Sequence, residues 1–408
     1  MPNHPQAVIL VAGKSTRTYP LTISKPKPLL PIVNKPILAH NLDQMVGLID
    51  EAILIVGFCK EMIQNYFGNE YRGIKLIYVE QKEQLGSGHA IRQAEPFIKD
   101  RFVMLVGDDL SSRKDIESVL QYRNCVVGKE VTNPQVFGVL LHKDGILEKI
   151  VEKPKDFIGN LASIGIHTFD RQIFEFLKQI PLSSRGEYEA TDAINMLAKK
   201  EKVYCIKVEG YWLPIGYPWE LLNANEYLLQ FIKRDFQGTV ESNVTIKGEV
   251  VIGKGSVVQS GAYIQGPAII GENCLIGPAS QIRGSSSIGN NVIIGHGVEI
   301  KNSIIMKNTV VNHWSYLGDS IIGENVNIGA GSISANLRHD GQNVKSVVKS
   351  VLVDTGRKKF GTVIGDRAKI GIHTSIYPGR KIWPDTITMP SDNIQYDVMN
   401  NDILSKCR

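Results

Sequence analysis

The sequence predicts a layered α/β domain followed by a parallel β-helix, and two observations lead to this prediction. Over about the first 235 residues, short apolar runs alternate with helical patterns, as expected for a sheet covered by helices. From about residue 240 onward, aliphatic side chains recur at every sixth position, which is the spacing of a hexapeptide β-helix repeat. We therefore expect one domain over residues 1–235 and a second over residues 236–408.

The first half contains four runs that are apolar enough to form buried central strands, at residues 7–11, 52–56, 74–79 and 102–106. Residues 36–46 and 88–94 are expected to form crossover helices. Such units build a mostly parallel sheet, whose ligands bind beyond the carboxyl ends of the strands. The loops after these strands are therefore the predicted place of binding.

The second half has valine or isoleucine at eleven positions spaced by six residues. These are Val240, Ile246, Ile252, Val258, Ile264, Ile270, Ile276, Ile282, Ile288, Ile294 and Ile300. Each repeat would form one side of a triangular coil, with its aliphatic side chain inside and Gly or Asn turning the corner. We expect the repeat to slip by four residues and to continue at Ile304, Val310, Tyr316, Ile322 and Ile328. A break between Ser334 and Gly361 predicts a protruding loop before the repeat resumes at Ile364, Ile370, Ile376 and Ile382.

The composition is that of an ordinary folded protein, with 43% hydrophobic and 21% charged residues. The net charge is +5, and the basic residues are interspersed with acidic ones and not clustered. This pattern disfavours a nucleic-acid-binding surface, but a small anionic substrate remains possible. The longest apolar run, residues 7–12, is too short for a membrane span, and no basic segment of a secretory signal precedes it. The cysteines are scattered and form no CxxC pair, so neither a disulfide framework nor a zinc site is expected. These features predict a cytoplasmic protein.

The loop after the first strand, LVAGKSTRTYPLTISKPKPLLP at residues 10–31, has the features of a phosphate-binding segment. Ala12 and Gly13 allow backbone N–H groups to approach phosphates, and Arg17 and Lys27 supply cations for a triphosphate. The string resembles the signature of sugar-1-phosphate nucleotidylyltransferases, LAAGxGTRLxPLTxxxPKxLxP, from which it departs at Ser15 and Thr18. The resemblance implies a Rossmann-like nucleotidyltransferase domain in which Arg17 and Lys27 are catalytic.

The resemblance continues into the nucleotide-binding motifs. EQKEQLGSGHA (80–90) is similar to the base-reading segment of uridylyl and thymidylyl enzymes, which implies that Gln81, Gly86 and Ser87 bind a pyrimidine. Asp108 in VGDD (106–109) matches the family's Mg²⁺ ligand, and one or two carboxylates with substrate phosphates commonly hold this ion. UTP and dTTP are both compatible with a pyrimidine-binding segment of this kind.

Four downstream segments match the sugar-side motifs in order: FGV (137–139), VEKP (151–154), NLASIGIHTFD (160–170) and GEYEATD (186–192). By resemblance, Gly138, Glu152 and Glu189 contact sugar hydroxyls, and Lys153 binds the sugar phosphate. YWLPIG (211–216) departs from the family, because Pro214 stands where the second Mg²⁺ ligand is commonly an Asp. Either the remaining groups hold Mg²⁺, or a neighbour substitutes, or nucleotidyl transfer is impaired.

The β-helix carries a second set of candidate residues. Arg283 and Lys301 are eighteen residues apart, which is three repeats, so they are expected to stack on one face of the coil. His313 opens HWSYLGDSIIGENVNIGAGSISAN (313–336), which resembles the acetyltransferase core of bacterial bifunctional N-acetylglucosamine-1-phosphate uridylyltransferases. That resemblance implies that Arg283 and Lys301 bind the substrate phosphate and that His313 is the general base. It also implies that three further residues position the amino sugar: Tyr316, Asn327 and Asn336.

Acetyl-CoA is the implied donor, placed near Ala330 and Gly331 with the loop after Asn336 closing the site. Leu337 replaces a Tyr and Ile372 replaces a Ser of that family, which puts substrate preference and donor affinity in question. The ending GDRAKIGIHTSIYPGRKIWP (365–384) resembles archaeal-type bifunctional sugar-1-phosphate nucleotidylyltransferase/acetyltransferases. Hexapeptide β-helices of such families are left-handed and commonly trimeric, so a homotrimer or a multiple of it is expected.

The sequence therefore predicts a two-domain bifunctional enzyme of nucleotide-sugar synthesis, with NTP, sugar 1-phosphate and acetyl-CoA as small-molecule partners. One alternative is a nucleotidylyltransferase whose β-helix serves only in oligomerisation, which the Arg283, Lys301 and His313 set disfavours. Another is a non-catalytic regulatory subunit with the same pair of domains, which Pro214 favours and the retention of Arg17, Lys27 and Asp108 disfavours.

Overall fold

The computed structural model describes residues 4–399, and their contacts divide the chain into two compact units. The α/β unit comprises residues up to 14, residues 26–29 and residues 37–214. The β-helix unit comprises residues 15–25, residues 30–36 and the chain from residue 215 onward. The signature loop at residues 10–31 therefore contributes to both units.

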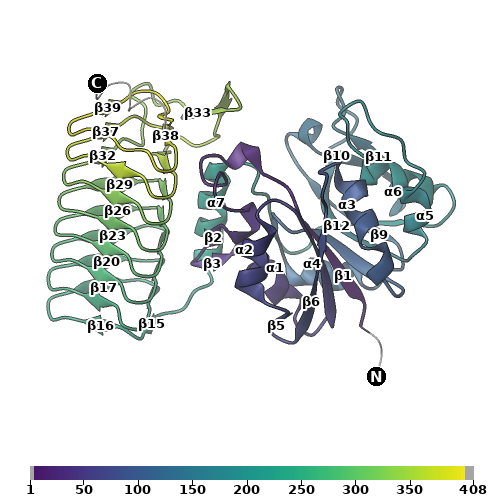
Figure 1. Cartoon of the computed structure of the whole chain (residues 1–408), viewed down its shortest axis with the longest axis horizontal. Helices are drawn as coiled ribbons and strands as arrows, with labels where there is room; N and C mark the ends of the chain where they lie inside the picture. The colour runs from purple at the N-terminus through teal and green to yellow at the C-terminus, as the bar shows by residue number, and fades with distance from the viewer. Residues whose placement is uncertain (1–3, 400–408) are drawn as a thin grey trace. The chain divides into compact units, whose positions relative to one another are not determined.

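The α/β unit is built on a ten-stranded sheet with the strand order β10-β11-β13-β9-β12-β7-β1-β4-β6-β5 (Figure 1). Its centre consists of four parallel strands at the predicted places: β7 (Phe102–Val106), β1 (Gln6–Val11), β4 (Glu51–Val56) and β6 (Ile74–Glu80). The other strands are β5 (Glu70–Tyr71), β9 (Cys125–Glu130), β10 (Gly138–Lys143), β11 (Ile146–Glu152), β12 (Leu161–Phe169) and β13 (Tyr204–Lys207). β12 runs antiparallel to β7 and β9, so the sheet is mixed on this side.

Helices cover both faces of this sheet because the central strands are apolar on both sides. α1 (Ile37–Met45), α2 (Lys60–Phe67) and α4 (Arg113–Val119) pack against one face. α3 (Ser87–Gln93), α5 (Ile173–Leu177) and α6 (Ala190–Ala198) pack against the other. α1 and α3 lie where the sequence predicts crossover helices, and the unit is the expected three-layered α/β fold.

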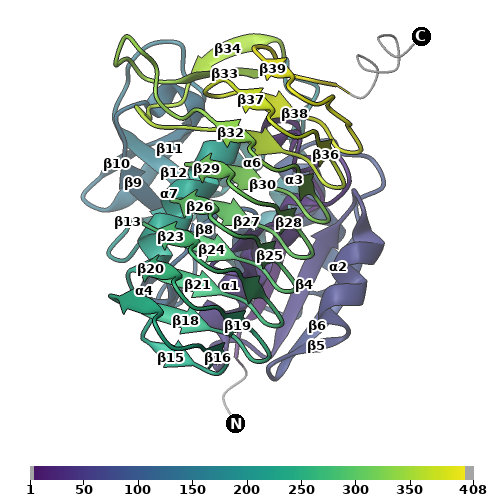
Figure 2. The same ribbon diagram turned by 90° about the vertical axis from the view of Figure 1, so that its left-hand side faces the viewer.

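The β-helix unit consists of three ladders of short parallel strands stacked along one axis (Figures 1 and 2), the expected left-handed parallel β-helix. The first ladder contains β15 (Asp235–Phe236), β18 (Val250–Ile252), β21 (Ala268–Ile270), β24 (Ser286–Ile288), β27 (Ile304–Ile305), β30 (Ile321–Ile322), β35 (Val363–Ile364) and β38 (Lys381–Ile382). The second contains β16 (Thr239–Val240), β19 (Val257–Val258), β22 (Leu275–Ile276), β25 (Ile293–Ile294), β28 (Val310–Val311), β31 (Asn327–Ile328) and β36 (Lys369–Ile370). The third contains β17 (Thr245–Lys247), β20 (Tyr263–Gln265), β23 (Gln281–Arg283), β26 (Glu299–Lys301), β29 (Tyr316–Gly318), β32 (Ile333–Ser334), β37 (Ser375–Ile376) and β39 (Asn393–Ile394).

The core of the coil confirms the six-residue repeat up to Ile300 and again from Ile322 onward. Between them the predicted register was wrong by one residue, because the inward side chains are Ile305, Val311 and Leu317. Tyr316, expected inside, is only partly buried and precedes the inward Leu317. The reason is a shortened corner between the third and first ladders, so that Ile300 is followed by Ile305, and Leu317 by Ile322, after five residues.

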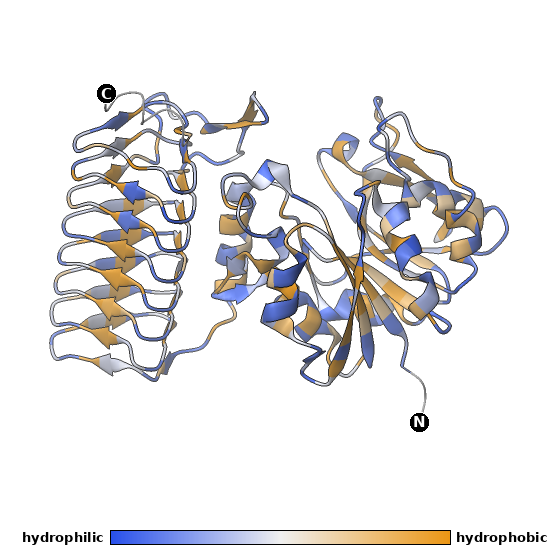
Figure 3. Cartoon of the chain, viewed as in Figure 1, coloured by the Kyte–Doolittle hydropathy of each residue, from blue (hydrophilic) through white to orange (hydrophobic). Residues whose placement is uncertain are grey.

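The predicted break in the repeat is an insertion between β32 and β35. It contains the antiparallel hairpin of β33 (Lys345–Val348) and β34 (Val351–Asp354). Figure 3 shows apolar residues concentrated on the strands of the sheet and of the coils, as expected for two separate cores. Within residues 4–399, no helix combines the length and the apolar composition that a bilayer-spanning helix needs.

α7 (Pro218–Leu229) packs alongside the first ladder within the β-helix unit. Its start is fixed by Pro218 at the first helical position and by Glu220, whose carboxylate accepts the backbone N–H of Tyr217 at 2.8 Å. Asn225 donates to the Ser285 carbonyl at 2.9 Å and accepts the Ser287 hydroxyl at 2.6 Å. These bonds attach the helix to the coil.

Candidate active sites

Three charged groups meet at the carboxyl end of the central strand β7. The Lys27 ammonium lies 2.9 Å from an Asp108 oxygen and 3.7 Å from an Asp109 oxygen. Lys27 is buried, whereas Asp108 is partly exposed to solvent. Two carboxylates next to one another suit an oxygen-ligated divalent cation whose remaining ligands come from phosphates and water. No group of three metal-ligating side chains occurs in residues 4–399, so the donor set fits such a cation only together with a substrate.

Pro214 lies close in register to these carboxylates. β14 (Trp212–Leu213) pairs antiparallel with β8 (Leu110–Ser111), and Leu213 is opposite Leu110. One residue further along this register, Pro214 follows Leu213 and Asp109 precedes Leu110. The position that departs from the family signature is thus set beside the carboxylate pair.

The predicted base-reading residues form one connected turn between β6 and α3. Gln81 is buried, and its amide donates to the Gly86 carbonyl at 3.1 Å. Gly86 has a φ of +94°, and a Cβ there would come within 2.8 Å of the Tyr188 carbonyl oxygen. The Ser87 hydroxyl accepts the Ala190 N–H at 3.2 Å. The turn is therefore packed against the segment that carries Glu189.

The predicted sugar-side residues are brought together by an arginine. Gly138 is opposite Glu152 in the β10–β11 pairing. Arg185 reaches both carboxylates, with a guanidinium nitrogen 2.7 Å from Glu189 and 3.4 Å from Glu152. The Lys153 ammonium is 3.7 Å from Glu152. Arg185 was not singled out from the sequence, although it precedes the GEYEATD motif directly.

A cavity of about 220 Å³ lies among these motifs. Its lining includes Ser87, Asp109, Gly138 and Glu152, so it joins the base-side, metal-side and sugar-side segments. His167 also lines it, and burial lowers the pKa of this imidazole to about 3, which keeps it neutral. Within the described residues its Nδ1 has no hydrogen-bond partner.

The start of the signature loop is divided between the two units. In the α/β unit, the Ala12 carbonyl accepts the Phe58 N–H at 3.1 Å and the Gln84 amide at 2.8 Å, while Gly13 is exposed. In the β-helix unit, Arg17 is exposed on the 3₁₀ turn Thr16–Thr18, and its guanidinium lies 5.5 Å from the centre of the Tyr217 ring.

On the third ladder of the β-helix, the predicted phosphate-binding residues are neighbours. Arg283 and Lys301 face one another across β23 and β26, which confirms the predicted stacking. Each is paired with a carboxylate: Arg283 with Glu299 at 2.5 Å and Lys301 with Asp319 at 2.7 Å. A substrate phosphate at this place would therefore meet two cations that are each held by a neighbouring carboxylate.

Asp319 is the centre of this second site. It is buried at a corner with a φ of +49°, and it accepts hydrogen bonds from Lys301, from Asn336 at 2.6 Å and from Asn302 at 2.8 Å. Asn336 also donates to the Tyr316 hydroxyl at 3.1 Å. Burial, with the charges of Asp319 and Glu299, raises the pKa of Tyr316, so it remains a neutral phenol at neutral pH.

The other predicted acetyl-transfer residues lie elsewhere on the coil. His313 is exposed at the corner between the second and third ladders, and its side chain makes no hydrogen bond within the described residues. Ala330 and Gly331 occupy the same corner one coil further, where the Gly331 N–H donates to the His313 carbonyl at 2.9 Å. Asn327 lies on β31 of the second ladder, away from the face of Lys301. One chain thus brings Arg283, Lys301, Tyr316 and Asn336 together, but not Asn327.

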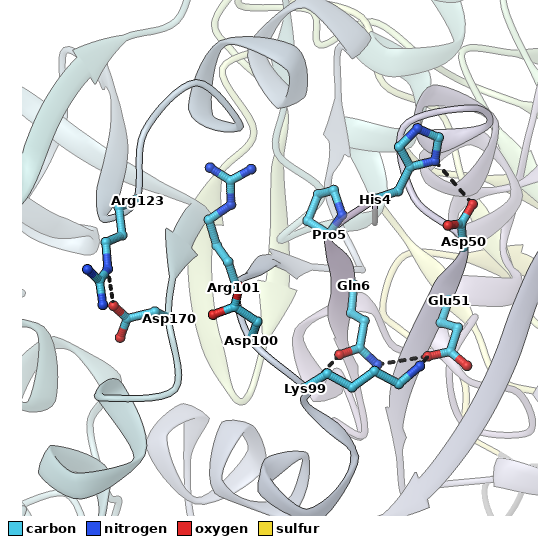
Figure 4. Close-up of a pocket in the computed structure, with 10 residues that line it drawn as sticks. All are labelled: His4, Pro5, Gln6, Asp50, Glu51, Lys99, Asp100, Arg101, Arg123 and Asp170. Carbon is cyan, nitrogen blue, oxygen red and sulfur yellow. Dashed lines mark hydrogen bonds and ion pairs between the residues drawn. The ribbon is translucent and has the colours of Figure 1, made fainter. Parts of the chain in front are cut away.

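A larger cavity of the α/β unit lies at the other end of the parallel strands (Figure 4). It measures about 710 Å³ and is lined by charged side chains that pair with one another, such as Lys99 with Glu51 at 2.8 Å. It is placed at the amino ends of β1 and β4, whereas parallel sheets bind ligands at the carboxyl ends. None of the predicted site residues lines it.

Comparison with known proteins bears on both units. The nucleotidyl transferase family matches residues 6–230, and the GMPPB C-terminal domain matches residues 264–371. A protein of Methanocaldococcus jannaschii named bifunctional protein GlmU is 44% identical over 402 residues, covering 98% of this chain and 97% of that protein. The chain belongs to this family of bifunctional transferases.

A second member of the family, from Sulfurisphaera tokodaii, is named bifunctional sugar-1-phosphate nucleotidylyltransferase/acetyltransferase. It is 38% identical and covers 96% of this chain and 98% of its own. Among solved structures, a UDP-glucose pyrophosphorylase complexed with UDP-glucose is 27% identical with a TM-score of 0.51, and it covers 56% of this chain and 99% of its own. Like these bifunctional relatives, the chain is an enzyme that combines nucleotidyl transfer with acetyl transfer in nucleotide-sugar biosynthesis.

Proposed function

We propose that the enzyme couples UTP or dTTP to a sugar 1-phosphate and that it N-acetylates an amino-sugar 1-phosphate with acetyl-CoA. The first activity is assigned to residues 1–235 and the second to residues 236–408. The main support is that two separate groups of charged side chains are present: Lys27 with Asp108 at the sheet, and Arg283 with Lys301 on the coil. Each contains cations that could pair with a phosphorylated substrate, which supports the proposal.

In nucleotidyl transfer, an oxygen of the sugar phosphate attacks the α-phosphorus of the NTP, and the bond to the β-phosphate breaks to release pyrophosphate. Arg17 and Lys27 neutralise charge on the triphosphate, and Ala12 and Gly13 offer backbone N–H groups to it. Asp108, assisted by Asp109, would hold Mg²⁺, which when bound neutralises further phosphate charge. The side chain of Pro214 has no atom that could bind Mg²⁺.

The remaining residues of this site set the substrates. Gln81, Gly86 and Ser87 hydrogen-bond the pyrimidine, and their packed turn favours a fixed base position. Gly138, Glu152 and Glu189 accept from sugar hydroxyls, while Lys153 holds the sugar phosphate. Arg185 keeps the two carboxylates beside each other, which supports their shared role.

In acetyl transfer, the amine of the sugar attacks the thioester carbonyl of acetyl-CoA, and the thiol of CoA leaves. The substrate amine arrives as an ammonium, so a base must first remove a proton, and His313 is suited to this because imidazole titrates near neutral pH. Arg283 and Lys301 hold the phosphate, and Tyr316, Asn327 and Asn336 position the sugar. Ala330 and Gly331 would contact the donor.

A homotrimer, or a multiple of it, is the assembly we favour. The outer face of the second ladder carries an aliphatic row formed by Val257, Leu275, Ile293 and Val310, which are cross-strand neighbours. Leu275 and Ile293 are 37% and 40% exposed. A contiguous apolar row of this kind is typical of a protein interface, and a second copy of the coil would cover it.

Pyrophosphate release and acetyl-CoA consumption, measured with a panel of NTPs and sugar 1-phosphates, test the assignment. Asp108→Ala is expected to lower pyrophosphate release by at least about a hundredfold, because it removes the principal carboxylate that would hold the charge-neutralising Mg²⁺. Acetyl transfer in the same protein should be unchanged. Wild-type pyrophosphate release in this variant would exclude Asp108 as the metal ligand.

A further inference from the structure

The signature loop contains a buried lysine that its proposed chemistry does not use. Lys25 is 4% exposed, and its ammonium lies 2.6 Å from Glu324 and 3.1 Å from Asp366. Both carboxylates belong to the β-helix: Glu324 follows β30, and Asp366 follows β35 on the adjacent coil. A buried ammonium is costly unless it is paired, so this lysine is fixed where it can meet both groups.

The neighbouring residue adds a second attachment. The Ser24 hydroxyl donates to an Asp366 oxygen at 2.8 Å. The other Asp366 oxygen accepts the Glu324 N–H at 2.9 Å, so the side chain of Asp366 is itself held in place. Two carboxylates on adjacent coils therefore face one end of the loop.

The coil itself does not require this charge. At the same corner three coils earlier, the neutral Asn290 accepts the Glu272 N–H at 3.0 Å, as Asp366 does for Glu324. A neutral amide thus suffices for the hydrogen bond between coils. The negative charge of Asp366 is explained by what it does for Ser24 and Lys25.

The other end of the loop carries Arg17. Between the two ends, the hydroxyls of Thr18 and Thr22 both donate to the Ser15 carbonyl, at 2.7 and 2.8 Å. Leu21 is 1% exposed. Residues 15–25 therefore form a closed, partly buried turn, and its fixed end lies at Ser24 and Lys25.

We propose that Glu324 and Asp366 are positioning residues for nucleotidyl transfer. They clamp residues 15–25 through Lys25 and Ser24 and thereby fix the direction in which the loop presents Arg17. This rests on the proposed role of Arg17 toward the triphosphate. The β-helix then serves both activities: it contains the acetyl-transfer site, and it supports a catalytic loop of the other site.

The test uses the full-length enzyme with Asp366→Asn, Lys25→Met and the double variant. Asp366→Asn keeps the volume and the acceptor for the Glu324 N–H but removes the charge. We expect kcat for pyrophosphate release to fall between about tenfold and a hundredfold, because small misplacements of charge-neutralising groups are costly. The KM for sugar 1-phosphate should change less than threefold. The kcat of the double variant should be no lower than that of the more impaired single variant, because both changes break the same clamp. The control is Asp385→Asn, which breaks the exposed Arg367–Asp385 pair on the adjacent coil.

Hydrogen exchange of the backbone amides at residues 15–25 supplies a readout that needs no activity. It should be faster in Asp366→Asn and Lys25→Met than in the wild type and in Asp385→Asn, while acetyl transfer stays within twofold in all of them. Wild-type nucleotidyl kinetics in both clamp variants would overturn the proposal, as would a parallel loss of both activities with a lower melting temperature. If the wild type releases no pyrophosphate with any NTP, the proposed nucleotidyl function fails, and the exchange alone then upholds or overturns the clamp.

Discussion

Asp319→Asn is the substitution that separates charge from shape in the proposed acetyl-transfer site. Asparagine has the volume of aspartate and tolerates the left-handed backbone of this corner, as Asn302 does at the equivalent corner one coil earlier with a φ of +46°. The fold of the coil should therefore be retained. What is lost is the negative charge toward Lys301 and the second acceptor for Asn336.

The size of the effect follows from the contacts. Asp319 accepts from Lys301 at 2.7 Å and from Asn336 at 2.6 Å, and Lys301 is only 18% exposed. A hydrogen bond to a charged group contributes about 1.5–3 kcal/mol, which corresponds to between about tenfold and a hundredfold in kcat/KM if the loss appears fully in catalysis. Because the role proposed for Lys301 is to hold the phosphate and not to react, most of this should appear as a higher KM for the amino-sugar 1-phosphate.

Acetyl-CoA consumption with glucosamine 1-phosphate or galactosamine 1-phosphate measures this, with Asp385→Asn as the control on a distant exposed carboxylate. Pyrophosphate release should be unaffected. An unchanged or lower KM in Asp319→Asn would refute the reasoning, because it would mean that Asp319 competes with the phosphate for Lys301 and does not position the lysine for it.

Three further predictions follow from the same contacts. Pro214→Asp should lower the Mg²⁺ concentration that half-saturates pyrophosphate release, because it restores a carboxylate beside Asp109; no change in the Mg²⁺ titration would count against this. His313→Ala should reduce kcat for acetyl transfer by about 10²–10⁴-fold with little change in KM, whereas Arg283→Ala should mainly raise KM. Acetyl-CoA consumption at the wild-type rate in His313→Ala would exclude His313 as the general base. Burial lowers the pKa of Lys381 from its ordinary 10.5 to about 8, so between about pH 8 and 10.5 the unfolded chain binds more protons than the folded one. As the pH rises through this range, the free energy of unfolding of the wild type, measured with urea, should increase by up to about 3 kcal/mol relative to Lys381→Met. Parallel pH profiles of the two proteins would contradict this.

The architecture was predictable because the repeat is a geometric rule. Eleven aliphatics spaced by six residues fix the inward face of each coil, and every one from Ile252 to Ile300 is buried in the core. The parallel order of the central strands was predictable for a related reason, since the helical segments expected at residues 36–46 and 88–94 separate apolar runs and favour crossover connections.

The one-residue shifts could not be read from the pattern. At Ile304 and Ile305, and again at Ile321 and Ile322, two aliphatics are adjacent, so either can satisfy the six-residue rule. The structure decides between them through the corners at Asn302 and Asp319, which turn with one residue fewer than the corner at Gly284. The choice depends on cross-strand pairing, which is not a property of local sequence.

The same distinction applies to the candidate sites: motifs identified some of their residues, and contacts in the folded chain identified others. Lys27 and Asp108 were each identified by motif, and the structure places them 2.9 Å apart. Arg185 and Asp319 were missed because neither matters by itself; each is defined by the partners that it holds together. A signal was present for Arg185, which stands only four residues before Glu189, so a local ion pair between the two was possible.

The Lys25 clamp marks the limit of sequence reasoning. Lys25 and Asp366 are 341 positions apart in the chain, and no periodicity relates them. Beside Lys27, a second lysine in a basic loop is most simply explained as another solvated charge. Its burial between two carboxylates changes that explanation, because a buried ammonium must be paired and therefore fixes the backbone that carries it. The motif contains the groups proposed to meet the phosphates, whereas the groups that hold Lys25 belong to the β-helix and become visible only in the folded chain.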